Sequence, residues 1–144
     1  MRRVLTPHWS IDLDESFESR VVDGDLKMVS AGPPMRTVLV SVLVPPASLA
    51  PFEVLSQAGA APDGVEVLER IGGGDDDEAR LGHWCAEEAM DGSATQYSLY
   101  CSTARRGQLV RITFVSDVAA DKSWALDSWN SLEFQVTPHP ETFD

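Results

Sequence analysis

The sequence predicts an α+β protein built around an antiparallel β-sheet. Strand-like segments, in which apolar and polar side chains alternate, follow one another in blocks and do not alternate regularly with helices. Regular alternation would instead indicate a parallel sheet. Turn-forming residues such as Asp23-Gly24 and Arg105-Arg106-Gly107 separate neighbouring strand candidates. Short turns of this kind connect antiparallel strands directly.

The first third of the chain contains one strand, one hairpin and one central strand. Residues 9–13 read WSIDL, and the alternation of their side chains predicts a half-buried strand. Segments 18–22 and 25–31 meet at Asp23-Gly24, a step that tolerates positive φ, and they predict a hairpin. Residues 36–44 form the most apolar run and are rich in β-branched side chains. We expect a central strand covered on both faces there.

Two helices are predicted. The first runs from a cap at Ser48 to Gln57, with Pro51 in the first turn, where its missing N–H costs little. The second runs over 118–133 after a cap at Asp117. At 100° per residue, one face of this second helix carries an apolar stripe. Its members are Val118, Ala125, Leu126, Trp129 and Leu132.

Between the helices, segments 65–71, 79–88, 95–103 and 108–116 predict a meander of four strands. Asp91-Gly92-Ser93 marks one of its turns. The run Gly72–Glu78, GGGDDDE, is predicted to be a solvated hairpin tip. A phosphate-binding loop would need a lysine after Gly74, and none is there. Three consecutive aspartates also diverge too much to form an EF-hand, which leaves weak, millimolar-range calcium binding as the alternative to a solvated turn.

The charge of the chain limits its partners. The net charge is −12 and the pI is about 4.5, so nucleic acid and anionic membranes are not expected as partners, whereas a basic protein is. No stretch approaches the roughly 20 apolar residues that span a bilayer, and the N-terminus lacks the apolar run of a signal peptide. We therefore expect a cytoplasmic protein. Two cysteines provide no disulfide framework, and no cofactor motif is present.

His83, Cys85 and Cys101 are the candidate metal ligands. His83 and Cys85 alternate on one strand and share a face. The two cysteines are about equally far from the turn at 91–93, which predicts that they approach each other on adjacent strands. Two thiols and an imidazole would suit zinc, although a fourth ligand is not identifiable. The competing interpretation is that the cysteines are small apolar residues of the core. No constellation of nucleophile, base and orienting group indicates catalysis.

Trp84 and Trp124 are the candidate binding residues. Trp124 points away from the apolar stripe of its helix, and Trp84 lies on the strand face opposite Cys85. Tryptophan is enriched at binding hot spots. The alternative is that a second layer of structure buries both indoles.

Residues at both ends of the chain carry a family resemblance. The pattern Trp9-x-Ile11-x-Leu13 precedes Phe17, the hairpin turn is Asp23-Gly24, and the chain closes with Trp129-x-Ser131-Leu132-x-Phe134. Over about residues 8–134 the sequence resembles the PsbP-like superfamily, which includes a Ran-binding import factor and the DcrB-like and LpqN-like domains. The typical opening has a proline where Asp14 stands here.

The resemblance implies one α+β domain over residues 1–144, with a core at about 8–134 and a short C-terminal tail. It also implies a non-enzymatic, protein-binding role, such as that of an adaptor, effector chaperone or immunity-type protein. No binding residue of the family can be transferred. The alternative function is a small metal-binding protein or enzyme that uses His83, Cys85 and Cys101.

Overall fold

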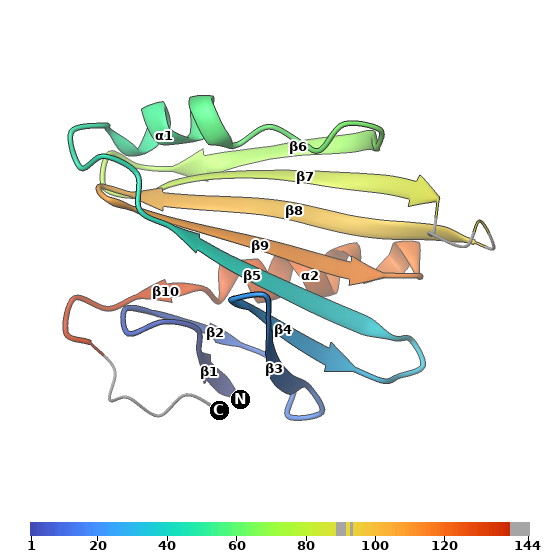
Figure 1. Cartoon of the computed structure of the whole chain (residues 1–144). Coiled ribbons are helices and arrows are strands. Elements are labelled where there is room, and N and C mark those ends of the chain that lie inside the picture. Colours follow the sequence, from blue (N-terminus) through green and yellow to red (C-terminus); the bar gives the residue numbers. More distant parts are fainter. Residues whose placement is uncertain (89–91, 93, 139–144) are drawn as a thin grey trace.

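The computed structural model describes residues 1–88, 92 and 94–138, and it contains two antiparallel sheets and two helices (Figure 1). The large sheet has seven strands in the order β3-β4-β5-β9-β8-β7-β6. Their bounds are β3 Glu18–Val22, β4 Asp25–Ser30, β5 Arg36–Leu43, β6 Glu66–Gly74, β7 Ala79–Glu88, β8 Thr95–Arg105 and β9 Gln108–Ser116. The small sheet contains β1 (Arg2–Val4), β2 (Trp9–Asp12) and β10 (Glu133–Phe134) in the order β1-β2-β10.

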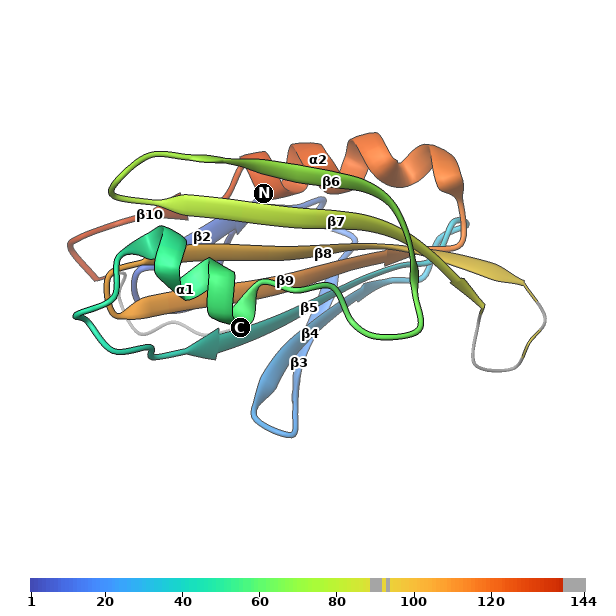
Figure 2. The same ribbon diagram turned by 90° about the horizontal axis from the view of Figure 1, so that it is seen from above.

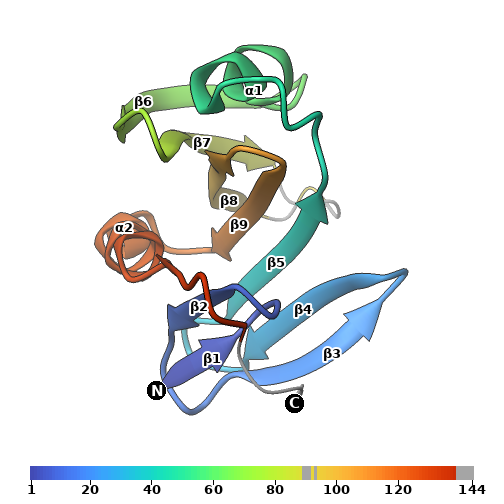
Figure 3. The same cartoon turned by 90° about the vertical axis from the view of Figure 1, so that its left-hand side faces the viewer.

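The two helices lie on opposite faces of the large sheet. Helix α1 (Pro51–Ala58) follows β5, and α2 (Lys122–Asn130) follows β9 after a short 3-10 turn at Ala119–Asp121. Helix α2 and the small sheet lie together on one face, which we call the covered face (Figures 2 and 3). Helix α1 lies over one end of the other face, which we call the open face. The predicted α+β class, with a helix after the central strand and a C-terminal helix, is confirmed.

The main core lies between the covered face and α2. Strand residues Leu99, Ile112 and Phe114 are almost fully buried there. Trp129 of α2 packs on them, and its Nε1–H donates a hydrogen bond of 3.0 Å to the Thr103 hydroxyl. A buried indole thereby keeps a partner for its one polar atom. A smaller cluster lies beneath α1 and contains Val54, Leu55, Ala79, Ala104 and Leu109.

The predicted turns fix the hairpins. Asp23 and Gly24 have φ values of 51° and 85°, and the turn pairs Val22 with Asp25. Two positive φ values in a row define the tight turn that the Asp-Gly step predicted. The meander β6–β9 is confirmed as well. Of its turn at 91–93, only Gly92 belongs to the described residues.

One prediction about the sheet is wrong. Strand β5 lies inside the sheet, as expected, but it is covered on one face only. Val38 and Val40 are buried on the covered face, whereas Leu39 and Leu43 are about 40–45% exposed on the open face. The reason is the shortness of α1, which packs mainly on β7 and β8, with Leu109 of β9 beneath it, at one end of the sheet.

The helix bounds also differ from the predictions. Helix α1 begins at Pro51, and the backbone N–H of Ala50 donates to Glu53, so Ser48 is not its cap. Helix α2 begins only at Lys122, because a 3-10 turn occupies the preceding residues.

Strand β6 continues through the three glycines to Gly74, which leaves Asp75–Glu78 as the turn. A bulge between Val67 and Glu69 leaves Leu68 without a cross-strand partner. Strands β1 and β10 were not predicted. The core also begins earlier than residue 8, because Leu5 belongs to it.

Candidate functional site on the open face

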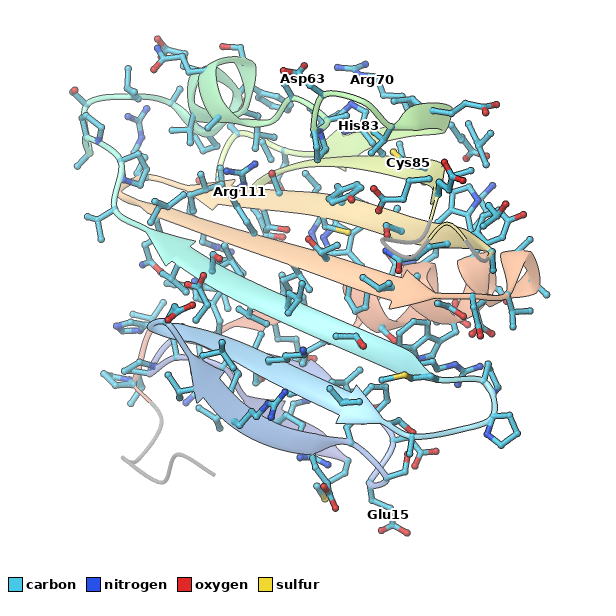
Figure 4. All side chains as sticks on the ribbon, turned by 45° about the vertical axis from the view of Figure 1, so that its right-hand side comes forward. Glu15, Asp63, Arg70, His83, Cys85 and Arg111 are labelled. Atoms are coloured by element: carbon cyan, nitrogen blue, oxygen red, sulfur yellow. The ribbon has the colours of Figure 1, made fainter. Side chains whose placement is uncertain are left out.

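A row of side chains, all polar or cationic except Leu39, crosses the open face. The strand registers place these residues opposite one another, one from each strand of the large sheet. From β3 to β6 they are Arg20, Lys27, Leu39, Thr113, Tyr100, His83 and Arg70. Arg111 lies two residues from Thr113 and therefore on the same face. Figure 4 shows Arg70, His83 and Arg111 on this side of the sheet, near Asp63 of the loop after α1.

The row borders a hollow of about 700 Å³ between the β3–β4 hairpin and the loop after α1. Leu39 and Leu43 provide apolar surface in it, Lys27 and Arg111 provide cations, and Asp23 and Asp25 at the hairpin end provide carboxylates. A smaller pocket of about 30 Å³ adjoins it at His83, Tyr100 and Arg111, enough space for one water molecule. The hollow is open to solvent along the sheet surface, so a macromolecular partner can reach its lining.

Four cations on this face are not neutralised. Within the described residues, Arg20, Lys27, Arg70 and Arg111 take part in no ion pair. The ion pairs of the molecule use other cations: Met1, Arg2, Arg36, Arg80, Arg105 and Lys122. These cations are therefore free to pair with acidic groups of a partner, and Asp23 and Asp25 lie at the hairpin end of the same hollow.

Tyr100 is held as a hydrogen-bond donor. Its hydroxyl donates to Glu87 Oε1 at 2.8 Å, and Ser98 and Gln96 donate to the same oxygen at 3.2 and 3.3 Å. Burial, the hydrogen bond to Glu87 and the charge of Glu87 raise the pKa of Tyr100 to about 12. The phenol therefore keeps its proton at neutral pH and cannot act as a base.

His83 and Cys85 share the open face, as predicted, but the thiol of Cys85 is not activated for chemistry. Burial, together with the nearby charge of Arg70, lowers the pKa of His83, so the imidazole is neutral at pH 7. Cys85 is fully buried, and burial and then the charge of Glu87 raise the pKa of its thiol. A protonated thiol is neither a good nucleophile nor a good metal ligand.

The predicted approach of Cys85 and Cys101 is wrong. Cys85 lies opposite Ser98, and Cys101 lies opposite Gly82, so the offset between the cysteines is an odd number of residues. Because side chains alternate along a strand, the two thiols point to opposite faces of the sheet. Burial raises the pKa of Cys101 well above its usual range. In the described part of the chain, no three His, Cys, Asp or Glu side chains are grouped to hold a metal.

The two candidate tryptophans are packed. Trp84 faces away from Cys85, as predicted, but it is only 5% exposed and stacks on Tyr97 with 5.9 Å between the ring centroids. Trp124 was expected to lie away from the packed side of its helix, free for a partner unless a second layer of structure buries it. It instead stacks on Phe17 at 6.0 Å and meets the edge of Phe114 at 5.7 Å. Their role in binding a partner stays a prediction, and free exposure no longer supports it.

Sequence reasoning missed the cations of the open face. The signal was present in the alternation, because Arg111 and Thr113 interleave with the buried Val110, Ile112 and Phe114. Such a pattern marks a strand with one solvent-facing side. What the sequence could not supply was the register that aligns these residues with Lys27 and Arg20.

No model of a known protein family matches the sequence, and no curated protein matches it. Among solved structures, the crystal structure of LpqN from Mycobacterium tuberculosis matches with a TM-score of 0.56. The match covers 88% of this chain and 83% of LpqN, at 8% sequence identity. The fold is similar to that of LpqN. LpqN is involved in cell envelope biogenesis, and at this identity the likeness to LpqN concerns the fold alone.

The match to LpqN confirms the predicted resemblance, because LpqN-like domains are among the groups that the sequence pattern indicated. Within the residues that the structure describes, no helix is long and apolar enough to cross a membrane.

Proposed function

We propose that this chain is a non-enzymatic protein-binding domain whose partner docks on the open face of the large sheet. The observation that carries the proposal is the composition of that face. Exposed apolar side chains of Val22, Leu39 and Leu43 lie beside cations that have no ion pair in the described structure. Exposed apolar surface rimmed by polar groups is typical of protein interaction sites.

The chemistry of the face supports binding over catalysis. The pKa of Tyr100 is raised to about 12, so its phenol keeps its proton at pH 7. The pKa of His83 is lowered and that of Cys85 is raised, and both shifts favour the neutral forms. The protonated phenol and thiol offer no activated nucleophile at pH 7, so the neutral imidazole of His83 has no nucleophile beside it to serve as a base. They do offer a rigid hydrogen-bonding surface.

The partner's contacting segment is acidic in this proposal. Arg20, Lys27 and Arg111 would each face an unpaired carboxylate or backbone carbonyl, and complementary charges fix the register of such a contact. The net charge of −12 acts at longer range and favours a basic protein. That basic partner stays a prediction for the remaining surface, as does the role of adaptor, effector chaperone or immunity-type protein.

Site-specific photo-crosslinking in the native host tests the proposal. A photoreactive amino acid replaces Leu39 on the open face, and a matched probe replaces Val44, which is 86% exposed and lies beyond the end of β5. We expect a discrete protein adduct from position 39 and none from position 44. Equal labelling from both positions, or none from position 39, would contradict docking on this face.

The protein identified in the crosslinked adduct is then purified, and its affinity for this chain is measured. The double variant Lys27→Glu/Arg111→Glu should weaken binding at least ten-fold, because both cations lie in the contact. Arg106→Glu changes an exposed cation in the β8–β9 turn, away from the open face, and serves as the control. Unchanged affinity in the double variant would remove the acidic segment from the proposal.

A further inference from the structure

A small polar pocket lies beneath the loop that follows α1, beside the hollow on the open face. Its volume is about 30 Å³, and Arg111 lines both the pocket and the hollow. Gly59 and Pro62 of the loop line the pocket from the other side. Within the described residues no aspartate or glutamate lines this pocket, whereas Asp23 and Asp25 line the hairpin end of the hollow. The pocket is therefore the part of the open face that is free of carboxylates.

Three polar side chains from neighbouring strands meet at this pocket. Ser102 of β8 lies directly opposite Arg111 of β9. His83 of β7 lies opposite Tyr100, two residues along β8 from Ser102. Diagonal neighbours of this kind are roughly 7–8 Å apart, so a small group between them can contact both side chains. Tyr100 is already engaged, because its hydroxyl donates to Glu87.

Two of the three side chains are buried without a hydrogen-bond partner. His83 is 8% exposed and Ser102 is 5% exposed. Neither the imidazole nor the hydroxyl bonds to any of the described residues. Both groups still reach open space, because Arg3 Nε is the one side-chain polar atom in the described structure that is fully enclosed and has no partner. Buried polar groups without partners are costly, so an oxygen that bonds to them from the pocket is stabilised.

The charges around the pocket favour an anion. Arg111 is exposed and forms no ion pair with the described residues. Burial and then the charge of Arg70 lower the pKa of His83, so a second unpaired cation acts on the imidazole. Asp63 lies on the same side of the sheet (Figure 4), but it pairs with neither arginine. A neutral imidazole and a hydroxyl each provide one donor, and a guanidinium provides several.

We propose that this pocket binds one carboxylate group, which the acidic segment of the docked partner supplies as an aspartate or glutamate side chain. One carboxylate oxygen takes the place of a water molecule and accepts hydrogen bonds from Ser102 and His83. The other oxygen stays at the mouth and pairs with Arg111, because a guanidinium matches a carboxylate in shape and charge. The inference rests on the proposed docking at the open face and names the group by which the partner is held there.

Titration of the full chain with acetate tests the pocket without knowledge of the partner. Acetate replaces chloride at constant ionic strength and pH 7, so the total charge in solution does not change. Acetamide serves as the uncharged probe of the same shape. Chemical shifts of backbone amides and imidazoles locate the binding. We expect saturable shifts at His83, Ser102 and Arg111 with acetate, and an affinity for acetamide that is lower by roughly five-fold or more.

Matched variants separate the pocket from general attraction to positive charge. Arg111→Gln should weaken acetate binding by roughly five-fold, because it removes the paired cation. Arg106→Gln removes an exposed cation of the β8–β9 turn and should leave acetate binding unchanged. Ser102→Ala should weaken binding by about three-fold through the loss of one donor. Ser128→Ala removes a hydroxyl of similar burial on α2 and serves as its control. Circular dichroism establishes that each variant is folded.

Three results with acetate would overturn the proposal. They are equal affinity for acetate and acetamide, equal effects of Arg111→Gln and Arg106→Gln, and shifts confined to other parts of the molecule. Absence of any acetate-induced shift would show that the pocket holds water only and would equally exclude the proposal. None of these results bears on docking at the open face, which the crosslinking at Leu39 tests on its own.

The crosslinked partner then tests the source of the carboxylate. Ser102→Ala should weaken binding of the partner by about three-fold, as it does for acetate, and Ser128→Ala should not. An affinity for the partner that Ser102→Ala leaves unchanged would overturn the assignment of the pocket to the partner's acidic side chain.

Discussion

The carboxylate of Asp121 joins three elements. Its Oδ2 accepts hydrogen bonds from Arg36 Nε at 2.9 Å and from the Ser116 hydroxyl at 2.6 Å, and its Oδ1 accepts from Arg36 Nη2 at 2.8 Å. Arg36 begins β5, Ser116 ends β9, and Asp121 precedes α2. A two-point arginine–carboxylate pair fixes direction as well as distance. The start of α2 is therefore tied to the middle of the large sheet.

This contact predicts a pH dependence of stability. The hydrogen bonds from Arg36 lower the pKa of Asp121 below the ordinary value of 3.8. The folded state therefore gains stability above that ordinary value, and the gain is lost as the pH falls through the lowered pKa. At pH 7, Asp121→Asn should lose roughly 2 kcal/mol of unfolding free energy. Urea unfolding should show this difference shrinking as the pH falls below 3.8 and through the lowered pKa of Asp121. Asp127→Asn, an exposed carboxylate of α2, is the control, and a difference that stays constant with pH would contradict the assignment.

Trp124 supports a second residue-scale prediction. It lies between Phe17 and Phe114, with the Arg36 guanidinium 4.9 Å from its ring centroid. Trp124→Ala should therefore destabilise the protein by about 3 kcal/mol, close to the range for a core tryptophan such as Trp129. Urea unfolding of both alanine variants measures this. A loss below roughly 1 kcal/mol would mean that Trp124 contributes little to packing and would return it to the candidates for partner binding.

At the scale of elements, Gly82 determines how closely α2 approaches the sheet. A Cβ atom at Gly82 would lie 2.8 Å from Cζ3 and 3.0 Å from Cη2 of the Trp129 indole. Gly82→Ala should therefore cost about 2 kcal/mol, because the helix must shift or the indole must leave its place. Gly72 and Gly73 of β6 have nothing within 4 Å of such a Cβ, so Gly72→Ala should be nearly neutral. Thermal unfolding of the two variants compares them, and equal effects would show that α2 packs loosely.

The sequence predicted where the strands lie better than it predicted to which face of the sheet their side chains point. Alternation and turn residues identified β2 to β9, because each signal lies within a few neighbouring residues. The pairing of Cys85 with Ser98 depends on the length of a turn, and an error of an odd number of residues exchanges the two faces. Helix α2 begins later than its apolar stripe suggested, because the side chain of Asp121 binds Arg36 and Ser116 and a 3-10 turn precedes the helix.

The apolar stripe of α2 also gave the wrong environment for Trp124, and the reason is geometric. Helix α2 lies against the large sheet, and the chain between β2 and β3 contributes Phe17 at its side. A helix contacted from two directions buries a wider arc than one apolar stripe. The candidate site on the open face could not be predicted from the sequence either. Its row of residues comes from seven strands, and the residues align only when the registers of all seven strands are known.

At the scale of the whole molecule, negative charge is in large excess. The net charge is −12, and the described residues contain six ion pairs. Repulsion among the unpaired acids should destabilise the folded state at low ionic strength. Raising NaCl from about 0.01 M to 0.15 M shortens the screening length from roughly 30 Å to 8 Å. We expect the unfolding free energy to rise by about 1 kcal/mol, which corresponds to roughly 4 °C in Tm.

Calorimetry over this salt range measures the effect, and choline chloride at equal ionic strength controls for binding of sodium. A Tm that falls with salt would mean that screening of the ion pairs outweighs screening of the repulsion. The same measurement applies to Lys27→Glu/Arg111→Glu, whose greater negative charge should steepen the salt dependence.

The bulge at Leu68 affects how copies of the protein meet in solution. Strand β6 is an outer strand of the large sheet, and its free backbone groups could pair with a strand of another molecule. The unpaired Leu68 interrupts the ladder midway, and Glu66, Glu69 and Arg70 place charges along the same edge. A bent, charged edge is a poor template for a further strand. Pairing of β6 with a strand of another copy should therefore be disfavoured, and fibres should not grow from this edge.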